Sequence, residues 1–461
     1  MLFHSPVFFV FFAVVFAVHR GLGVRGQNAV ALLASYVFFG WWDWRFLGLL
    51  WLSTGVDFLC ALRIEAADAR ARRRWLWVSL AVNLGLLGFF KYAGFFVDSA
   101  VDLLTALGFA AHRPTLAIVL PIGISFYTFQ TMAYTIDVYR GRLAACRDPL
   151  RFAVYVAWFP QLVAGPIERA THLLPQFAKR RVADGEALAS GAVLMLIGYV
   201  RKVAIADTVA PHVDAVFANP AAHGSGALAL CVLLFALQIY GDFAGYSDIA
   251  RGASRMMGVE LMENFAHPYF ATDITAFWRR WHISLSSWLR DYLYIPLGGN
   301  RGGPWRTDRN LMLTMLLGGL WHGAGWNFVA WGGLHGLALL MHKRVQRSGE
   351  AGRARRVFGW LLTMAVVGLA WVFFRAADFG QAWAVLSGIV AFEGGAARRT
   401  LLIAAVALFA LLFIDVPQAR AGDHLALRRW PWWLRGPVYA GMALAAVLLS
   451  GTEVPFLYFQ F

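Results

Sequence analysis

Residues 316–336 read LLGGLWHGAGWNFVAWGGLHG, a run mainly of glycine, tryptophan and aliphatic residues that contains His322. The run contains no acidic residue, lysine or arginine. Glycine lets the backbones of neighbouring membrane helices approach closely. The stretch therefore predicts two apolar helices packed tightly together, with His322 in a buried pocket and His335 on the second helix.

The whole chain has the same apolar character. Of its 461 residues, 59% are hydrophobic and only 15% are charged, whereas a soluble domain has about 25% charged residues. This composition excludes a soluble globular, disordered, collagen-like or disulfide-rich secreted protein. The three cysteines are far apart and predict neither a disulfide framework nor a zinc site.

Apolar runs long enough to cross a membrane recur along the chain. A spanning helix needs about 20 mainly apolar residues, and the runs show no alternation typical of strands. We predict an all-α polytopic membrane protein, a single domain over residues 1–461, with about eleven to thirteen membrane segments. The predicted spans lie near residues 5–19, 28–42, 46–62, 75–97, 115–137, 187–206, 226–248, 309–322, 326–342, 356–374, 400–416 and 434–452.

The formal net charge of +15 follows from basic residues in short connectors, such as those at 70–74 and 179–181. Loops rich in Lys and Arg are typical of the cytoplasmic side of a membrane protein, so a nucleic-acid partner is not predicted. The loop bias alone explains the basic residues; the alternative is a secondary role in holding an anionic donor such as a coenzyme A thioester.

Two stretches do not fit a simple span. Residues 150–169 are apolar but contain Pro160 and Pro166, which predicts a re-entrant or interfacial segment. Residues 277–297 alternate aromatic, cationic and polar residues, which predicts an amphipathic segment lying along the membrane. A glycine-rich turn follows at residues 298–303.

Ionisable residues within membrane segments are candidates for function. A neutral imidazole at His322 could accept a proton from a hydroxyl nucleophile, because histidine titrates near neutral pH. The alternative is a core histidine bonded to a backbone carbonyl. For His282, in the amphipathic segment, the alternatives are an interfacial residue and a role beside His322. No metal-ligand spacing and no G-x-S-x-G motif occurs in the sequence.

The segment QIYGDFAGYSDIARG (238–252) places Asp242 and Asp248 beside Tyr240 and Tyr246 at the end of a predicted span. These side chains could bind a hydroxylated substrate or a cation. They could equally cap a helix and form hydrogen bonds with neighbouring helices.

RRWHISLSSWLRDYLYIPLGGNRGG (279–303) and LWHGAGWNFVAWGGLHG (320–336) closely resemble the membrane-bound O-acyltransferase superfamily, especially its bacterial branch that acetylates extracellular polysaccharides such as alginate. The resemblance covers essentially the whole chain, with the core motifs at about 262–336. Supporting similarities are FHSPVFF (3–9), SYVFFGWWDWRF (35–46), FFKYAGFF (89–96), LPIGISFYTFQTMAYTIDVYRG (120–141), FPQLVAGPIER (159–169), MENFAHPYF (262–270) and VPFLYFQF (454–461).

The resemblance implies a helical bowl in which His322 is catalytic and His282 is the second histidine of the site. It also implies an acyl donor on the cytoplasmic side, with acetyl-CoA expected and no bound cofactor or metal. A periplasmic partner with a serine-hydrolase-like (SGNH) fold would complete transfer to the polysaccharide, and the protein would lie in the bacterial inner membrane. The residues expected to contact substrate are Trp321, Trp326, Asn327, Arg290, Asp291, Tyr240 and Asp242.

Several alternatives stay open on the sequence. Within the superfamily, the chain could transfer D-alanine to teichoic acid from a carrier-protein thioester. Outside it, the chain could be a transporter or channel, with Asp242, Asp248 and His322 forming an ion path, or an inactive scaffold for a periplasmic partner. Alginate is the favoured acceptor, with cellulose, other exopolysaccharides and peptidoglycan as further candidates.

Overall fold

The computed structural model describes residues 1–110, 112, 118–345, 352–450 and 455–457. All regular elements among these residues are helices, so the all-α prediction is confirmed. Parts of the predicted spans 115–137 and 434–452, and most of the motif 454–461, lie outside the described residues.

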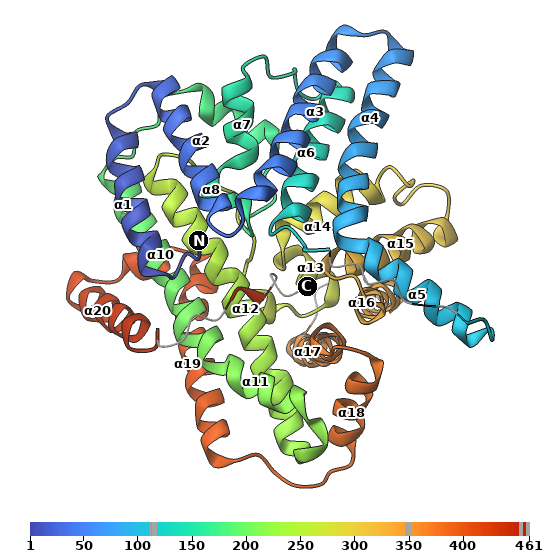
Figure 1. Ribbon diagram of the computed structural model, residues 1–461. Coiled ribbons are helices and arrows are strands. Elements are labelled where there is room, and N and C mark those ends of the chain that lie inside the picture. Colours follow the sequence, from blue (N-terminus) through green and yellow to red (C-terminus); the bar gives the residue numbers. More distant parts are fainter. Residues whose placement is uncertain (111, 113–117, 346–351, 451–454, 458–461) are drawn as a thin grey trace. The chain divides into compact units, whose positions relative to one another are not determined.

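The chain forms two compact units. The first comprises residues 1–188 and 253–261, and the second comprises residues 189–252 and 262–461. Helices α1 to α9 belong to the first unit, and helices α13 to α20 belong to the second (Figure 1). The prediction of a single membrane domain stays a prediction.

The first unit contains long helices followed by short, broken ones. Its elements are α1 (Pro6–Arg20), α2 (Val24–Gly40), α3 (Leu47–Ala66), α4 (Ala69–Leu87), α5 (Ala93–Ala106), α6 (Ile124–Tyr139), α7 (Pro149–Ala157), α8 (Phe159–Leu162) and α9 (Ala170–Leu173).

A buried carboxylate joins α3 to α4 in this unit. Asp57 is fully buried and accepts hydrogen bonds from Ser79 Oγ at 2.5 Å and from Asn83 Nδ2 at 2.8 Å. Buried charged groups need such donors to offset the loss of water. Asp57, Ser79 and Asn83 of these apolar helices therefore face the protein interior.

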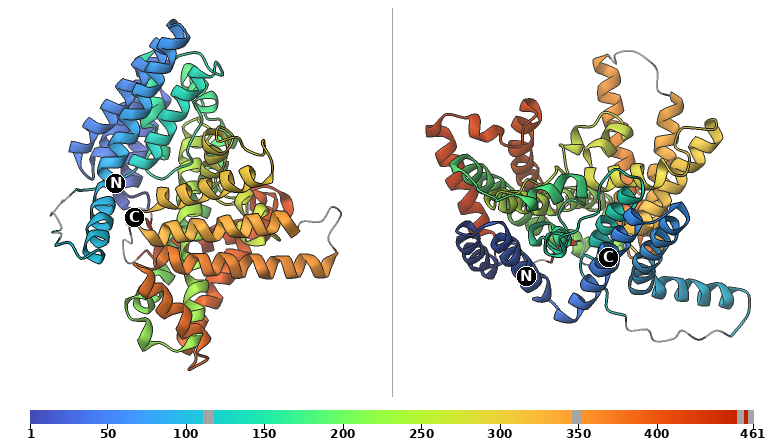
Figure 2. Two further views of the ribbon diagram at one scale, coloured as in Figure 1. Left: turned by 90° about the vertical axis from the view of Figure 1, so that its right-hand side faces the viewer. Right: turned by 90° about the horizontal axis from the view of Figure 1, so that it is seen from above.

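Most of helix α12 belongs to the second unit, and the residues of α12 from 253 onward belong to the first unit. Figure 2 shows α15, α16 and α17 stacked side by side in this unit. The elements are α10 (Gly185–Tyr199, which begins in the first unit), η4 (Val200–Asp207), α11 (Thr208–Ala218), α12 (Ser225–Met256), η6 (Pro268–Phe270), α13 (Ile274–Arg280), α14 (Ile283–Leu289), α15 (Pro304–His322), α16 (Trp326–Val345), α17 (Arg353–Arg375), α18 (Phe379–Val390), α19 (Arg398–Ala421) and α20 (Trp432–Leu448).

Six helices among the described residues are long and apolar enough to cross a membrane, and α1 and α18 are shorter apolar helices. The chain is therefore a multi-pass membrane protein, and the larger number of membrane segments stays a prediction. The six candidate spans are Trp44–Ala66, Ala69–Ala106, Gly185–Ala218, Ser225–Met256, Arg353–Arg375 and Arg398–Ala421.

The two irregular stretches of the sequence are broken helices. In the first, α7 ends at Ala157, Trp158 adopts non-helical angles, and Pro160 lies in the first turn of α8. In the second, α13 and α14 are separated at Trp281 and His282. Proline lacks the N–H that a continuing helix requires, which explains the first break. The second break lies at the candidate site.

Candidate active site

The hairpin of α15 and α16 positions His322. The two helices cross at Gly319 and Gly332, where an added Cβ atom would lie 2.2 Å from the carbonyl oxygen of Phe328 and of Met315, respectively. Only glycine allows such a close approach of backbones. The predicted tight packing of these glycines is confirmed, and it places the last residue of α15 against α16.

His322 lies in an aromatic environment. Its side chain is buried, with 3% of the residue exposed. The ring centroid lies 5.0 Å from that of Trp321, 5.0 Å from that of Trp331 and 5.6 Å from that of Phe374. Two of these rings meet the imidazole edge to face at 81°. The predicted burial of His322 is therefore confirmed, and the predicted pocket around it stays a prediction.

His282 lies beside His322, with 6.1 Å between the two ring centroids. It is fully buried and follows the end of α13. Its φ of 44° lies in the left-handed region, which is unfavourable for a residue with a Cβ atom and is typical of functional sites. Phe243, at 4.6 Å, and Trp321, at 5.9 Å, pack against its ring.

Asn264 holds His282 in this strained position. Its Oδ1 lies 3.1 Å from His282 Nδ1 and accepts from the hydroxyl of Ser284 at 2.9 Å and the backbone N–H of Ser284 at 3.3 Å. Its Nδ2 donates to Ser247 Oγ at 3.3 Å, and its backbone oxygen accepts from Ile283 N. One residue thus binds three consecutive positions of the turn.

These contacts determine which nitrogen of His282 carries the proton. The backbone N–H of Ser284 is always a donor, so the atom of Asn264 that faces it is the acceptor oxygen. His282 Nδ1 must therefore donate to the same oxygen, and Nε2 is left as the proton-accepting nitrogen. Burial lowers the pKa of His282 to about 3, so the ring is neutral at physiological pH.

The sequence interpretation did not identify Asn264. The residue lies in the quoted motif MENFAHPYF, so the motif marked the region. Its partner His282 is 18 residues away, across irregular backbone with no fixed period. No spacing rule could have joined the two residues.

The structure brings Trp321 to the histidine pair but gives other predicted substrate residues different neighbours. Asn327 Nδ2 donates to the carbonyl oxygen of Ala376 at 2.7 Å and so fixes the start of α16 to the end of α17. Trp326 is 56% exposed. Arg290 and Asp291 form an ion pair at 2.8 Å at the protein surface. Their roles in substrate binding stay predictions.

Tyr240 and Asp242 belong to a buried polar network. The hydroxyl of Tyr240 donates to Asp415 Oδ2 at 2.7 Å. Lys202 Nζ lies 2.7 Å from Asp242 Oδ1 and 2.7 Å from Asp207 Oδ1. Tyr240 and Asp242 thus form hydrogen bonds with neighbouring elements, and their role in substrate binding stays a prediction.

Arg201 is the centre of this network. Its guanidinium donates to Asp248 of α12 and to Asp415 and Gln418 of α19, and only 1% of its side chain is exposed. The ion pairs join η4, α12 and α19. Buried charges are tolerated when paired in this way, so the network holds together the helices that support the histidine pair.

His335 is also fully buried. Its ring lies parallel to that of Phe277, at 6.0 Å and 3°. Within the described part of the chain, neither of its ring nitrogens has a hydrogen-bond partner. The same residues include no cluster of three or more histidine, cysteine or acidic side chains that could hold a metal ion.

A multi-pass helical protein with two buried, adjacent histidines has the features expected of a membrane enzyme in which histidine accepts and donates a proton during group transfer. Residues 146–390 match the family of membrane-bound O-acyltransferases, MBOAT. The chain belongs to this family and is an O-acyltransferase.

Three relatives illustrate its place there. It is 46% identical to the "Probable alginate O-acetylase" of Pseudomonas aeruginosa, over 85% of this chain and 75% of that protein. It is 36% identical to the "Peptidoglycan O-acetyltransferase" of Helicobacter pylori, over 86% of this chain and 80% of that protein. It is 26% identical to the "Teichoic acid D-alanyltransferase" of Bacillus subtilis, over 56% of this chain and 67% of that protein.

Proposed function

We propose that this protein transfers acetyl groups from a cytoplasmic thioester, acetyl-CoA, across the bacterial inner membrane for O-acetylation of an envelope polysaccharide, with an alginate-like polymer favoured. The observation that carries the proposal is the pair of His282 and His322, buried together under Trp321. The relatives named for acetyl transfer support the acetyl group, since they are similar over more of the chain than the D-alanyltransferase.

In this proposal His322 is the general base. It removes the proton from an acceptor hydroxyl as the oxygen attacks the thioester carbonyl. The C–S bond breaks as the new C–O ester bond forms, and the proton passes from the imidazole to the departing thiolate, so that an ester and a thiol are the products. General-base catalysis of this kind contributes about 10²–10⁴-fold in rate.

The second histidine assists in its neutral form. With Nδ1 bonded to Asn264, the Nε2 of His282 is an acceptor. It can therefore receive a hydrogen bond from the hydroxyl or from His322 and orient it for proton transfer. A protonated His282 would be a donor on both nitrogens and could not do this.

The proposal includes a second protein outside the membrane. The chain has no G-x-S-x-G motif, so a periplasmic SGNH-hydrolase-like partner would supply the serine that passes the acetyl group to the polymer. An acetylated serine on that partner is the expected intermediate. The acceptor hydroxyl that His322 activates would then belong to the partner.

The test compares base-released acetate from separated exopolysaccharide and peptidoglycan fractions of cells that carry the protein or its His322→Ala variant, at matched membrane abundance. His342→Ala is the control, because His342 lies on the neighbouring α16 and 26% of its side chain is exposed. We expect acetate to disappear from one fraction with His322→Ala and to stay with His342→Ala. Unchanged acetate in both fractions would refute the proposal.

A further inference from the structure

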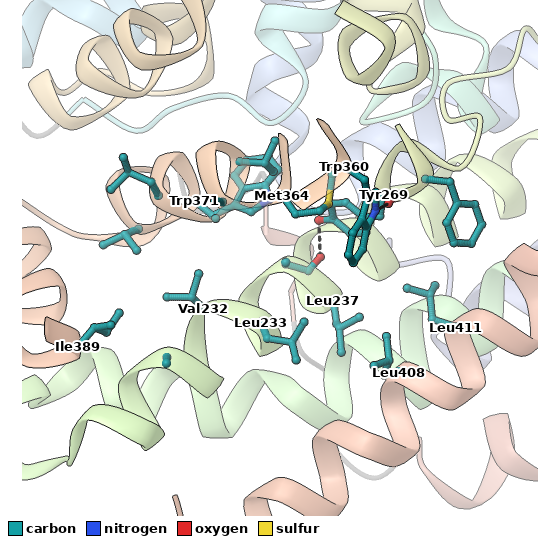
Figure 3. Close-up of a pocket in the computed structure, with 18 of the residues that line it drawn as sticks. Val232, Leu233, Leu237, Tyr269, Trp360, Met364, Trp371, Ile389, Leu408 and Leu411 are labelled. Carbon is teal, nitrogen blue, oxygen red and sulfur yellow. Dashed lines mark hydrogen bonds between the residues drawn. The ribbon is translucent and has the colours of Figure 1, made fainter. Parts of the chain in front are cut away.

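The second unit contains an apolar cavity of about 710 Å³ that the catalytic proposal does not use. Its walls come from α12, α17 and α19, with α18 and η6 at its ends. Figure 3 shows Met364 and Trp371 of α17 on one side, and Val232 and Leu237 of α12 with Leu408 of α19 on the other. The volume lies within the range of ligand-binding pockets, about 300–1,000 Å³.

The cavity opens at exposed leucines and ends at buried side chains. Leu233, Leu369 and Leu412 are 41%, 39% and 37% exposed. Leu237 and Trp371, which also line the cavity, are each 1% exposed. Because α12, α17 and α19 are three of the candidate membrane spans, we expect lipid chains to surround the leucines at the opening.

The lining is suited to hydrocarbon and lacks features that recognise a polar ligand. The hydroxyl of Tyr269 donates to the carbonyl oxygen of Ala236 at 2.7 Å, and Trp360 Nε1 donates to the carbonyl oxygen of Tyr269 at 2.8 Å. Asp415 is bonded to Arg201 and Tyr240. These groups already bond within the protein, so water would find few partners in the cavity.

An empty cavity is also unfavourable, because its lining loses dispersion contacts. A lipid chain entering between the leucines would restore them without moving a polar group out of water. The inner wall lies close to the catalytic pair: Trp371 packs against Trp331 at 6.1 Å and Phe374 at 5.4 Å, and both of these rings contact His322. One aromatic layer separates the cavity from His322.

We propose that this cavity binds one hydrocarbon chain of a bilayer lipid, which enters between α17 and α19 and ends against Trp371. The site recognises the chain and not the headgroup. The proposal concerns lipid binding and does not depend on the acyl group or on the acceptor.

The test uses the full chain in vesicles of phosphatidylethanolamine and phosphatidylglycerol, with a small fraction of phosphatidylethanolamine that carries a photoactivatable diazirine near the end of one acyl chain. Illumination followed by mass spectrometry locates the labelled residues. We expect labelling of the inner-wall residues Leu237 and Leu411, which are 1% and 3% exposed. Phe409, 69% exposed on α19, reports labelling by surrounding lipid.

Gly368→Leu should fill the cavity. Gly368 lines it, and a Cβ atom there would lie 3.5 Å from Val232 Cγ1, an ordinary contact. Gly441→Leu is the matched control, since nothing lies within 4 Å of a Cβ at this exposed position of α20. We expect Gly368→Leu to lose the labelling of Leu237 and Leu411 and to keep that of Phe409, whereas Gly441→Leu keeps all three.

Absence of inner-wall labelling in the unmodified protein would overturn the proposal, as would equal inner-wall labelling in Gly368→Leu. Gel filtration checks the folding of the variants, and Ala236→Phe, at another lining position, replaces Gly368→Leu should the latter aggregate. Because labelling requires no acetyl transfer, a failure of the proposed function would leave this result unaffected.

Discussion

Asn264 Oδ1 lies 3.1 Å from His282 Nδ1, and the same oxygen accepts the backbone N–H of Ser284 at 3.3 Å. This relationship fixes the orientation and the tautomer of a histidine that stands 6.1 Å from His322. Asn264 is therefore a positioning residue: it acts on the site through His282.

Replacing Asn264 should change the pH dependence of acetyl transfer. The carboxylate introduced by Asn264→Asp faces Nδ1–H and stabilises the imidazolium, so the pKa of His282 rises from about 3. His282 is then protonated below the raised pKa, and Nε2 becomes a donor there. We expect the acid limb of the pH–activity profile to move to higher pH, with activity largely retained above it.

Asn264→Ala provides the comparison. It removes the hydrogen bond without adding a charge, so transfer should fall at every pH while the acid limb stays in place. Initial rates of acetate transfer in membranes between pH 4 and 9, a range chosen around the ordinary histidine pKa of about 6.5, would measure both variants. The same profile for Asn264→Asp as for the unmodified protein would show that Asn264 only supports the fold.

Alanine substitutions at two adjacent glycines of α16 should have different effects on stability and on acetyl transfer. A Cβ at Gly332 would lie 2.2 Å from the backbone oxygen of Met315, whereas a Cβ at Gly333 would lie 3.5 Å from Leu316 Cδ2. Gly332→Ala must push α15 away and displace His322, which costs about 1–3 kcal/mol. Gly333→Ala should be neutral or stabilising by up to about 1 kcal/mol.

The measurements are the midpoint of thermal unfolding in detergent and the rate of transfer. We expect both to fall in Gly332→Ala and neither to fall in Gly333→Ala. Equal behaviour of the two variants would mean that the crossing at Gly332 does not position the site.

Arg201 should be essential for stability. Arg201→Met leaves Asp248 and Asp415 buried without their cation, and breaking a buried ion pair in this way costs about 3–5 kcal/mol. The second variant combines Arg201→Met with Asp415→Asn and Asp248→Asn, and it should regain part of the lost stability. Thermal unfolding would show both effects; a triple variant less stable than Arg201→Met would contradict this account.

Arg45→Met is the matched control. Arg45 pairs with Asp43 at 2.6 Å, but 71% of its side chain is exposed. Exposed ion pairs contribute little to stability because water and salt screen them. We expect the unfolding temperature of this variant to stay close to that of the unmodified protein.

The sequence predicted those features of the site that depend on local composition. The glycines around His322 indicated a close helix crossing, since the absence of a side chain has the same consequence in any membrane helix. Apolar runs likewise predicted the positions of α3, α12, α17 and α19, because hydrocarbon selects for them directly.

The features that the sequence did not predict depend on partners far along the chain. Arg201 and Lys202 interrupt a predicted span, and their meaning becomes clear only when Asp248, Asp415 and Asp242 lie beside them. Helix α12 continues to Met256, beyond its predicted end at 248, and Arg251 in this extension pairs with Asp248 of the same helix. Polar side chains extend a membrane helix when the protein itself satisfies them.

His335 is a third buried histidine, to which the proposed mechanism assigns no role. Its ring stacks on Phe277, and neither nitrogen has a hydrogen-bond partner in the described part of the chain. Each such buried polar group costs about 1–3 kcal/mol, so His335→Phe should keep acetyl transfer and raise the unfolding temperature. The same change at His282 should abolish transfer, because it removes the bond to Asn264 and the accepting Nε2. Loss of transfer in a stable His335→Phe variant would instead show that His335 also serves the acetyl-transfer site.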